Sequence, residues 1–333
     1  MTAGGRPRRR DGPTLEERAF HRWLARRLPS GSSGALPLGD DAAEVELERG
    51  EVAVVTTDAL VEGTHFVARS PPAAVGRAAS AVSLSDVAAK GARPVGVFLA
   101  VVAPRGTPQR WAEQLVLGAE REAARFGGHV LGGDTKPGSF HAVISTVVGA
   151  VPAGQAVGRT GARPGEALVT TGVVGRGGAA ARGLLRGEAA RGRAVVALLR
   201  LTPRVREGVA LRPFASAMLD TSDGIAESAH LLAAASRVRV VVREPAVPWA
   251  PGVRHLRLPA ERRSAGFYGG DYELLASVPS GRVDAATRAV RAVGGRLTVV
   301  GAIEPGSGAV LETERGRRAM PRGSWRPFGR TMP

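Results

Sequence analysis

Acidic residues recur in short runs at the ends of apolar segments of this chain. Each run combines an acid with Gly, Ser or Thr, and the six runs occupy residues 39–41, 56–58, 85–86, 132–135, 220–224 and 270–273. Carboxylate and hydroxyl oxygens suit hard cations such as Mg²⁺, which keeps its remaining positions for water and phosphate. A phosphoryl-transfer site needs this arrangement, because metal ions let carboxylates and the phosphates of ATP share one place.

Each run taken alone has a simpler interpretation, since Asp before a helix is commonly an N-cap and Asp-Gly is commonly a turn. Asp86 is the hardest to explain in this way. It lies inside an expected helix of small and apolar residues, where Asp has poor helix propensity. A buried carboxylate there needs a partner, and a metal ion would supply one. Six runs in a chain of net charge +16 therefore favour a metal-assisted site.

A glycine-rich segment, 172–178, resembles a nucleotide-binding loop only superficially. It lacks an acid about 20 residues further on, as the dinucleotide fingerprint requires, and no Gly-Lys-Ser/Thr follows, as a P-loop requires. We expect a tight strand-to-helix turn here, so an ATP site in this chain must be of another kind.

The elements that would position these acids alternate between strands and helices. We expect helices over 73–90, 108–127, 225–235 and 282–293. The expected strands are 52–57, 95–103, 129–131, 142–151, 167–171, 217–219, 238–242, 272–278 and 297–302. An earlier helix is expected to begin at Thr14 in a capping box with Glu17, and Thr107 is the expected N-cap of the helix over 108–127. The Gly- and Pro-rich stretch 152–165 marks a boundary. The pattern predicts an α/β or α+β protein with a flexible basic tail (1–12), an N-terminal domain (13–152) and a C-terminal domain (153–333).

Composition narrows the class of protein further. A length of 333 residues, 44% of them apolar and 23% charged, is typical of a folded two-domain protein. No apolar run approaches the ~20 residues of a membrane helix, and we expect neither a signal peptide nor a membrane partner. The absence of Cys excludes disulfides and thiolate metal sites and fits a cytoplasmic location. The charge of +16 could attract nucleic acid, but aromatic residues are only 4% and the Arg residues are scattered, so we do not expect such a partner.

Seven ordered segments together resemble the thiamine-monophosphate kinase family, within the aminoimidazole ribotide synthetase-like superfamily. They are GDDAAEV (39–45), TTDALVEGTHF (56–66), SLSDVAAKGARP (83–94), GGDTK (132–136), GRTGARPGEALVTTG (158–172), LDTSDGIAES (219–228) and GGDYELL (269–275). The resemblance spans about residues 14–330.

The resemblance implies a two-domain α/β (α+β) fold whose N-terminal domains pair into a homodimer. It also implies direct transfer of the γ-phosphoryl group of ATP to thiamine monophosphate, assisted by several Mg²⁺ ions. Catalysis would then rest on alignment and charge neutralisation, with no covalent intermediate.

The resemblance also implies roles for individual residues. The implied metal-holding set is Asp41, Thr56, Thr57, Asp58, Asp86, Asp134, Asp220 and Asp223. The implied ATP contacts are Gly133, Asp134, Arg159 and Ser222, and the implied substrate contacts are His65, Gly270 and Phe328. Without the resemblance, Arg159 would be one more surface arginine, His65 a structural or exposed histidine, and Phe328 an ordinary apolar residue of the C-terminal tail.

One departure from the family pattern concerns the acceptor. Gly270 stands where the family carries a substrate-contacting Glu before Asp-Tyr-Glu, so an enzyme with the same ATP machinery and another acceptor remains an alternative. We expect Gly270→Glu to tighten thiamine monophosphate binding, provided that the backbone φ there is not positive. Asp271 could reach the acceptor only if the two glycines reshape the turn, and Glu273 would face away. Lesser departures are Thr56 in place of Ser and Lys90 in place of an apolar residue.

Other functions fit the sequence less well. Selenophosphate synthetase and the hydrogenase-maturation relatives typically carry functional cysteines, and the aminoimidazole ribotide branch usually reads Gly-Gly-Glu-Thr where this chain has residues 132–135. A non-catalytic nucleotide-binding or nucleic-acid-associated protein would have little use for an intact set of metal positions.

Overall fold

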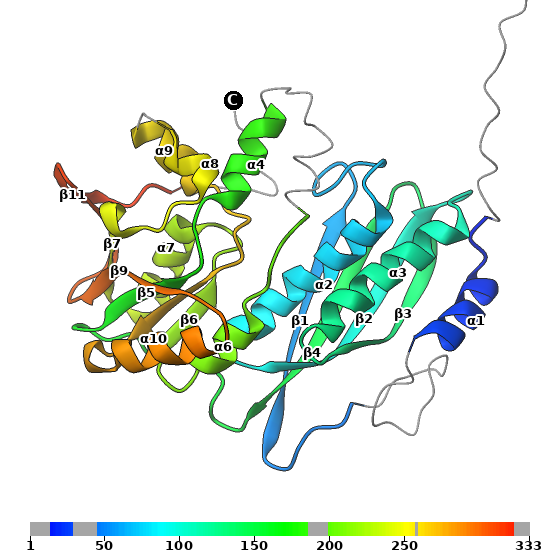
Figure 1. Cartoon of the computed structure of the whole chain (residues 1–333), viewed down its shortest axis with the longest axis horizontal. Helices are drawn as coiled ribbons and strands as arrows, with labels where there is room; N and C mark the ends of the chain where they lie inside the picture. The colour runs from blue at the N-terminus through cyan, green and yellow to red at the C-terminus, as the bar shows by residue number, and fades with distance from the viewer. Residues whose placement is uncertain (1–13, 29–44, 186–198, 257–258, 323–333) are drawn as a thin grey trace, which may run out of the picture.

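The computed structural model describes residues 14–28, 45–185, 199–256 and 259–322, and Figure 1 shows the chain. Two units lie side by side along the long axis of the molecule, each built on one sheet with helices packed against it. The predicted basic tail and the predicted site residues Asp41 and Phe328 lie outside the described part of the chain. Within the described part, none of the helices has the length and apolar character needed to cross a bilayer.

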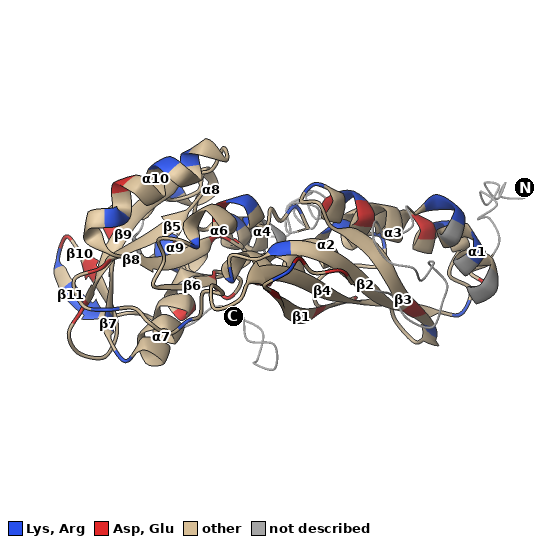
Figure 2. Cartoon of the chain, turned by 90° about the horizontal axis from the view of Figure 1, so that it is seen from below, with Lys and Arg blue, Asp and Glu red and all other residues tan. Residues whose placement is uncertain are grey.

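The first unit is a four-stranded sheet in the order β1-β4-β2-β3. Its strands are β1 (Glu51–Val61), β2 (Arg93–Pro104), β3 (His129–Gly138) and β4 (Ala142–Pro152). Only the β2–β3 pair is parallel. Helices α2 (Pro72–Ala89) and α3 (Gln109–Ala124) cover one face of the sheet, and α1 (Glu17–Arg27) packs beside α3. In Figure 2, no helix of the described part covers the opposite face of this sheet.

The second unit is a mixed seven-stranded sheet in the order β11-β10-β7-β9-β5-β8-β6. Its strands are β5 (Ala167–Thr171), β6 (Ala217–Asp220), β7 (Arg239–Arg243), β8 (Leu274–Val278), β9 (Leu297–Glu304), β10 (Gly308–Thr313) and β11 (Gly316–Ala319). Its helices are α4 (Arg176–Leu185), α6 (Val205–Leu211), α7 (Ile225–Ser236), α8 (Pro251–Arg254), α9 (Pro259–Gly266) and α10 (Val283–Ala292), with short 3-10 turns at Glu244–Ala246 and Ser280–Arg282. Helices α6 and α10 lie on one face and α7 on the other.

Helix α2 connects the two units. It packs against α3, β1 and β4 of the first unit and against α6 and β6 of the second, so it is buried almost all round. Its sequence explains this, because its Ala, Ser, Val and Gly side chains leave room for neighbours on every face. The contact with α6 is close enough that a Cβ at Gly208 would lie 2.1 Å from the carbonyl oxygen of Ala88. The described core is correspondingly continuous from the first unit into α6, α10 and β8.

The mixed α/β class is confirmed, and the predicted helices over 73–90 and 225–235 match α2 and α7 to within a residue at either end. The capping box at Thr14 is wrong. Helix α1 begins at Glu17, the Glu16 carboxylate accepts a hydrogen bond from Ala19 N at 2.7 Å, and Thr14 instead pairs with Pro108 in an isolated bridge. A tertiary backbone contact therefore replaces the local cap.

The predicted N-cap at Thr107 is also wrong. Helix α3 begins at Gln109 with Pro108 at the cap position, and the Thr107 hydroxyl donates to the carbonyl oxygen of Pro104 at 2.8 Å. The hydroxyl closes the turn that precedes the helix, which is a local alternative open to Thr in such positions.

Two glycines set the distance between α2 and α3. A Cβ at Gly76 would lie 1.8 Å from the carbonyl oxygen of Leu115, and a Cβ at Gly118 would lie 2.1 Å from the carbonyl oxygen of Ala73. Both contacts are with backbone atoms, which cannot rotate away as a side chain can. The helices must therefore separate if either glycine gains a side chain.

We expect Gly76→Ala to lower the free energy of unfolding by about 1–3 kcal/mol, because overpacking at this helix contact outweighs the gain in helix propensity. Urea unfolding followed by circular dichroism would measure the change. Gly281→Ala is the matched control, since a Cβ there meets nothing within 4 Å. Equal stability of Gly76→Ala and the wild-type protein would show that α2 and α3 are not held at this separation.

Candidate active site

The centre of the site is Asp220, at the end of β6. Its side chain is buried, with 7% exposure, and it accepts hydrogen bonds from Ser85 Oγ at 2.8 Å and from Ser222 Oγ at 2.9 Å. Burial and the nearby Asp86 raise the pKa of Asp220 to about 6, while the two serine hydroxyls act in the opposite direction. Because Ser85 belongs to α2, this hydrogen bond joins the two units at the site.

Strand β1 contributes two further residues to the site, Thr56 and Asp58. Thr56 Oγ1 donates to Asp86 Oδ2 at 2.7 Å, and Asp58 lies two residues further along the same face of the strand. Burial, followed by the charges of Asp86, Asp220 and Asp223, raises the pKa of Asp58 to about 7. The structure therefore brings together five of the eight residues predicted to hold metal: Thr56, Asp58, Asp86, Asp220 and Asp223.

These four aspartates form what we call the acid cluster (Asp58, Asp86, Asp220 and Asp223). Within the described residues, no three acidic or histidine side chains already converge as a ready set of metal ligands. The chemistry of the cluster nevertheless fits a divalent cation, because mutual repulsion and burial raise carboxylate pKa values that a bound cation would lower. The donors are all hard oxygens, as Mg²⁺ requires.

Two cations lie beside the acid cluster. Lys90, at the C-terminal end of α2, donates from Nζ to the carbonyl oxygen of Met218 at 3.3 Å. Burial and Glu227 raise the pKa of Asp223, and the Arg159 guanidinium opposes this rise. Arg159 is exposed in the segment between β4 and β5, so its side chain is available to an incoming anion. The sequence singled out Arg159 but gave Lys90 no role.

Thr57 and Asp134 lie apart from the acid cluster. The Thr57 hydroxyl is 3.0 Å from that of Thr146, across the β1–β4 pair and on the face of β1 opposite to Thr56. Asp134 is exposed on β3 and accepts a hydrogen bond from Lys136 Nζ at 2.6 Å. Strands β1 and β3 are the two opposite edges of the sheet, so Asp58 and Asp134 are separated by three strand spacings, or about 14 Å.

At position 133, beside Asp134, the close approach of β3 to β2 leaves room only for glycine. A Cβ at this position would lie 1.9 Å from the carbonyl oxygen of Leu99 on the neighbouring strand. The backbone of β3 can therefore approach β2 only because position 133 has no side chain. Gly133 is itself exposed, which leaves its backbone accessible to a ligand.

Gly270 adopts a backbone conformation that disfavours the family's Glu. Its φ is +77°, and Gly269 before it has a φ of +108°. The turn is fixed by a hydrogen bond from Gly270 N to the carbonyl oxygen of Ser222 at 2.7 Å. The condition for the expected gain from Gly270→Glu is therefore not met, because a side chain at positive φ is strained.

The two acids that follow Gly270 are occupied within the protein. Asp271 accepts hydrogen bonds from Gly175 N at 2.7 Å and Gly177 N at 3.0 Å, at the N-terminus of α4, and burial raises its pKa to about 7. Glu273 is fully buried and forms a two-pronged ion pair with Arg204, with both contacts at 2.6 Å. Neither carboxylate replaces the missing Glu, and the glycine-rich segment 172–178 is confirmed as a strand-to-helix turn.

Tyr272 is a site residue that the sequence reasoning missed. Its φ is +54°, unusual for a residue with a side chain. Burial, followed by the charges of Asp220, Asp58, Asp223 and Asp86, raises its pKa, so its hydroxyl lies near the acid cluster. No local signal identified it, because the alternation of side chains along an extended strand does not apply where φ is positive.

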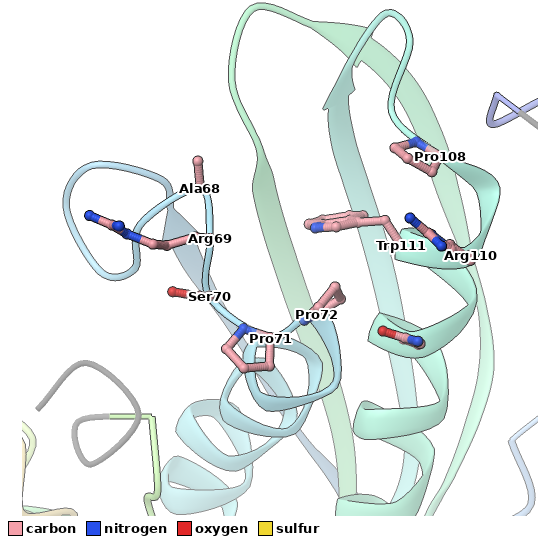
Figure 3. Close-up of a pocket in the computed structure, with 9 residues that line it drawn as sticks. Ala68, Arg69, Ser70, Pro71, Pro72, Pro108, Arg110 and Trp111 are labelled. Carbon is pink, nitrogen blue, oxygen red and sulfur yellow. The ribbon is translucent and has the colours of Figure 1, made fainter. Parts of the chain in front are cut away.

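The predicted substrate contact His65 lies in the loop after β1. Its Nδ1 accepts a hydrogen bond from Val61 N at 3.1 Å, and burial lowers its pKa. An open cavity of about 380 Å³ lies further along the same loop, between the starts of α2 and α3 (Figure 3). Its walls include Arg69, Arg110 and Trp111. The cavity is at the opposite end of α2 from Asp86, about 20 Å away along the helix, so it is separate from the acid cluster.

Known proteins match this chain over almost its whole length. Residues 39–159 match the family model described as AIR synthase related protein, N-terminal domain, and residues 163–314 match the corresponding C-terminal domain. The thiamine-monophosphate kinase of Caulobacter vibrioides is 36% identical over 309 residues, which is 90% of this chain and 86% of the relative. That of Halobacterium salinarum is 37% identical, covering 80% of this chain and 87% of the relative.

Solved structures agree with this result. Thiamine-monophosphate kinase from Stenotrophomonas maltophilia K279a superimposes with a TM-score of 0.78 at 31% identity, covering 89% of this chain and 95% of that one. AaThiL complexed with AMPPCP and TMP gives a TM-score of 0.72 at 26% identity, covering 84% and 89%. The chain therefore belongs to the AIR synthase related family, and within it to the thiamine-monophosphate kinases.

Proposed function

We propose that this protein transfers the γ-phosphoryl group of ATP to thiamine monophosphate, giving ADP and thiamine diphosphate. The acid cluster carries the proposal, because it collects four carboxylates and two neighbouring cations from separate elements at one place. A similar structure was solved with AMPPCP and TMP, which supports both substrates. The name shared by relatives that match over most of the chain favours thiamine monophosphate over another acceptor.

Mg²⁺ ions would be held by the acid cluster together with Thr56 and, from outside the described residues, Asp41. When bound, the ions supply positive charge that neutralises the phosphates during transfer. Ser222 is already oriented by its hydrogen bond to Asp220, and Arg159 offers a two-pronged contact to a phosphate. These residues would align the acceptor phosphate oxygen with the γ-phosphorus while the bond to ADP breaks, with no covalent enzyme intermediate.

His65, the backbone at Gly270, and Phe328 remain the proposed contacts to thiamine monophosphate. With Asp271 and Glu273 occupied elsewhere, no carboxylate in the 269–275 turn takes the place of the family's Glu. Recognition of the cationic acceptor would then depend on other groups, and Tyr272 is the nearest aromatic candidate in this turn.

We also propose that the protein is a homodimer formed by the first sheet. The uncovered face of that sheet carries apolar side chains, among them Val55, which is 61% exposed and lies on the face of β1 opposite to Thr56. Asp134 lies about 14 Å from Asp58 within one chain, so a second copy is needed to bring an Asp134 to the acid cluster. Pairing would therefore bury the apolar face and complete the metal-holding set.

We propose domain limits of 13–152 and 153–333, which fit the end of β4 at Pro152 and the start of β5 at Ala167. A cytoplasmic location suits ATP as co-substrate. Nucleic acid is not proposed as a partner, since no feature of the site requires it.

We expect Asp86→Asn and Asp220→Asn each to reduce phosphoryl transfer by about 100-fold or more, because metal-borne charge contributes several kcal/mol to such a step. Chromatographic detection of thiamine diphosphate from Mg-ATP and thiamine monophosphate would measure it. Asp284→Asn, an exposed acid in the first turn of α10, is the control and should keep full activity. Normal turnover in either site variant at limiting Mg²⁺ would refute the metal assignment.

The raised pKa of Asp58 predicts that this residue lowers the stability of the folded, metal-free protein to an extent that depends on pH. Between its ordinary pKa and about 7, the folded protein holds a proton on Asp58 that the unfolded chain has released, so stability falls as pH rises across this range. Asp58→Asn removes this cost. In EDTA, we expect its melting temperature to exceed that of the wild type by a margin that grows between about pH 4 and 7 and is constant above that range. A margin independent of pH would contradict the electrostatic origin.

Mixed dimers test whether Asp134 acts in the partner's site. A heterodimer of Asp58→Asn and Asp134→Asn chains, purified with two tags, contains one site with both acids and one with neither. We expect about half of the wild-type activity, although each variant alone is inactive. A heterodimer of Asp58→Asn and Asp86→Asn chains is the control and should be inactive, since each of its sites lacks one acid. Inactivity of both heterodimers would place Asp134 with its own chain's cluster.

A further inference from the structure

Lys90 is one of only two lysines in the chain, and it lies at the C-terminal end of α2. It follows Asp86 by four residues, so the two side chains share a face of the helix. Its ammonium group donates to the carbonyl oxygen of Met218 at 3.3 Å, and Met218 precedes Asp220 by two residues on β6. The lysine therefore lies on the same face of α2 as Asp86 and bonds to β6 close to the end that carries Asp220.

Lys90 and Arg159 flank the same strand. Met218 accepts the hydrogen bond from Lys90 with its carbonyl oxygen, and its N–H donates to the carbonyl oxygen of Gly158 at 2.8 Å, next to Arg159. Burial and the Arg159 charge lower the pKa of Lys90, and Asp220 and Asp86 oppose this effect. The two cations thus interact electrostatically with acids at the end of β6, Lys90 with Asp220 and Arg159 with Asp223.

Hydrogen bonding within the protein does not by itself explain this lysine. An ammonium group has three donors, and one contact of 3.3 Å to a carbonyl oxygen is its single hydrogen bond within the described residues. Partial burial of a charge is costly unless it is paired, so the charges of Asp220 and Asp86 must offset the cost of burying this ammonium group. The family pattern has an apolar residue here, which would give the acids no such partner. That hydrogen bond uses one of the three donors, and the charges of Asp220 and Asp86 act on the same ammonium group, which indicates a functional use.

We propose that Lys90 is a built-in cation of the nucleotide site, which supplies fixed positive charge to the acid cluster and to the polyphosphate of ATP and so lowers the Mg²⁺ concentration needed for nucleotide binding. This inference rests on the proposed ATP site. A mobile Mg²⁺ must be recruited from solution, whereas the charge on Lys90 is already in place when the nucleotide arrives.

Calorimetric titration with a non-hydrolysable ATP analogue at stepped Mg²⁺ concentrations tests the proposal. We expect Lys90→Met to weaken binding about tenfold at limiting Mg²⁺, the effect of one charge at close range, and to approach wild-type binding at saturating Mg²⁺. Lys90→Arg should bind nearly as the wild type does at both. Arg206→Met removes one exposed positive charge of α6, away from the site, and should change nothing. Weakening of the same size at every Mg²⁺ concentration, or no weakening, would overturn the proposal.

Melting temperatures without nucleotide provide a second measurement. In EDTA at pH 7.5, Lys90→Met should melt below the wild type, because the acid cluster loses its neighbouring charge, and Mg²⁺ should remove the difference. A difference in melting temperature that Mg²⁺ does not remove would mean that Lys90 stabilises the fold only by packing and hydrogen bonding, and would overturn the proposal. If no protein, including the wild type, binds the ATP analogue, the proposed ATP site fails, while the Mg²⁺-dependent melting still decides whether Lys90 neutralises the cluster.

Discussion

The hydrogen bond between Ser85 and Asp220 joins the two units at the place where their acids meet. Four aspartates come together there although their charges repel and two of them have pKa values raised to about 6 and 7. The fold maintains this arrangement because α2 packs against both units, against α3, β1 and β4 in one and against α6 and β6 in the other. An electrostatically unfavourable site is thus held by the packing of a helix that has almost no exposed face.

In the 269–275 turn, the acids on either side of Tyr272 bond within the second unit, whereas Tyr272 lies near the site. Asp271 caps α4, and Glu273 pairs with Arg204, so both carboxylates are satisfied inside the second unit. Tyr272 between them turns toward the acid cluster at a φ of +54°. The positive φ values at Gly269 and Gly270 make this turn possible, and they also explain why the backbone at 270 is poorly suited to a larger residue.

Charge is distributed unevenly between the general surface and the site. The chain has a net charge of +16, carried almost entirely by arginine, yet the site concentrates carboxylates and admits two nearby cations, Lys90 and Arg159. The metal-free cluster therefore contributes instability that a divalent cation or a bound nucleotide with its metal would relieve. This relation links the stability of the molecule to the ligands that its chemistry requires.

The sequence by itself determined the α/β class, most helices and strands, the family and the identity of the acids, because these depend on local periodicity and on ordered motifs. It missed β10 and β11 and misplaced the cap at Thr14, where a bridge to Pro108 replaces the local hydrogen bond. Only the tertiary structure decided that the face of β1 with Thr56 meets Asp86 of α2, that Asp134 lies on the opposite edge of the sheet, and that Lys90 stands beside Asp220. Strand order, side-chain direction and backbone φ follow from packing between segments far apart in the chain, and no local motif encodes them.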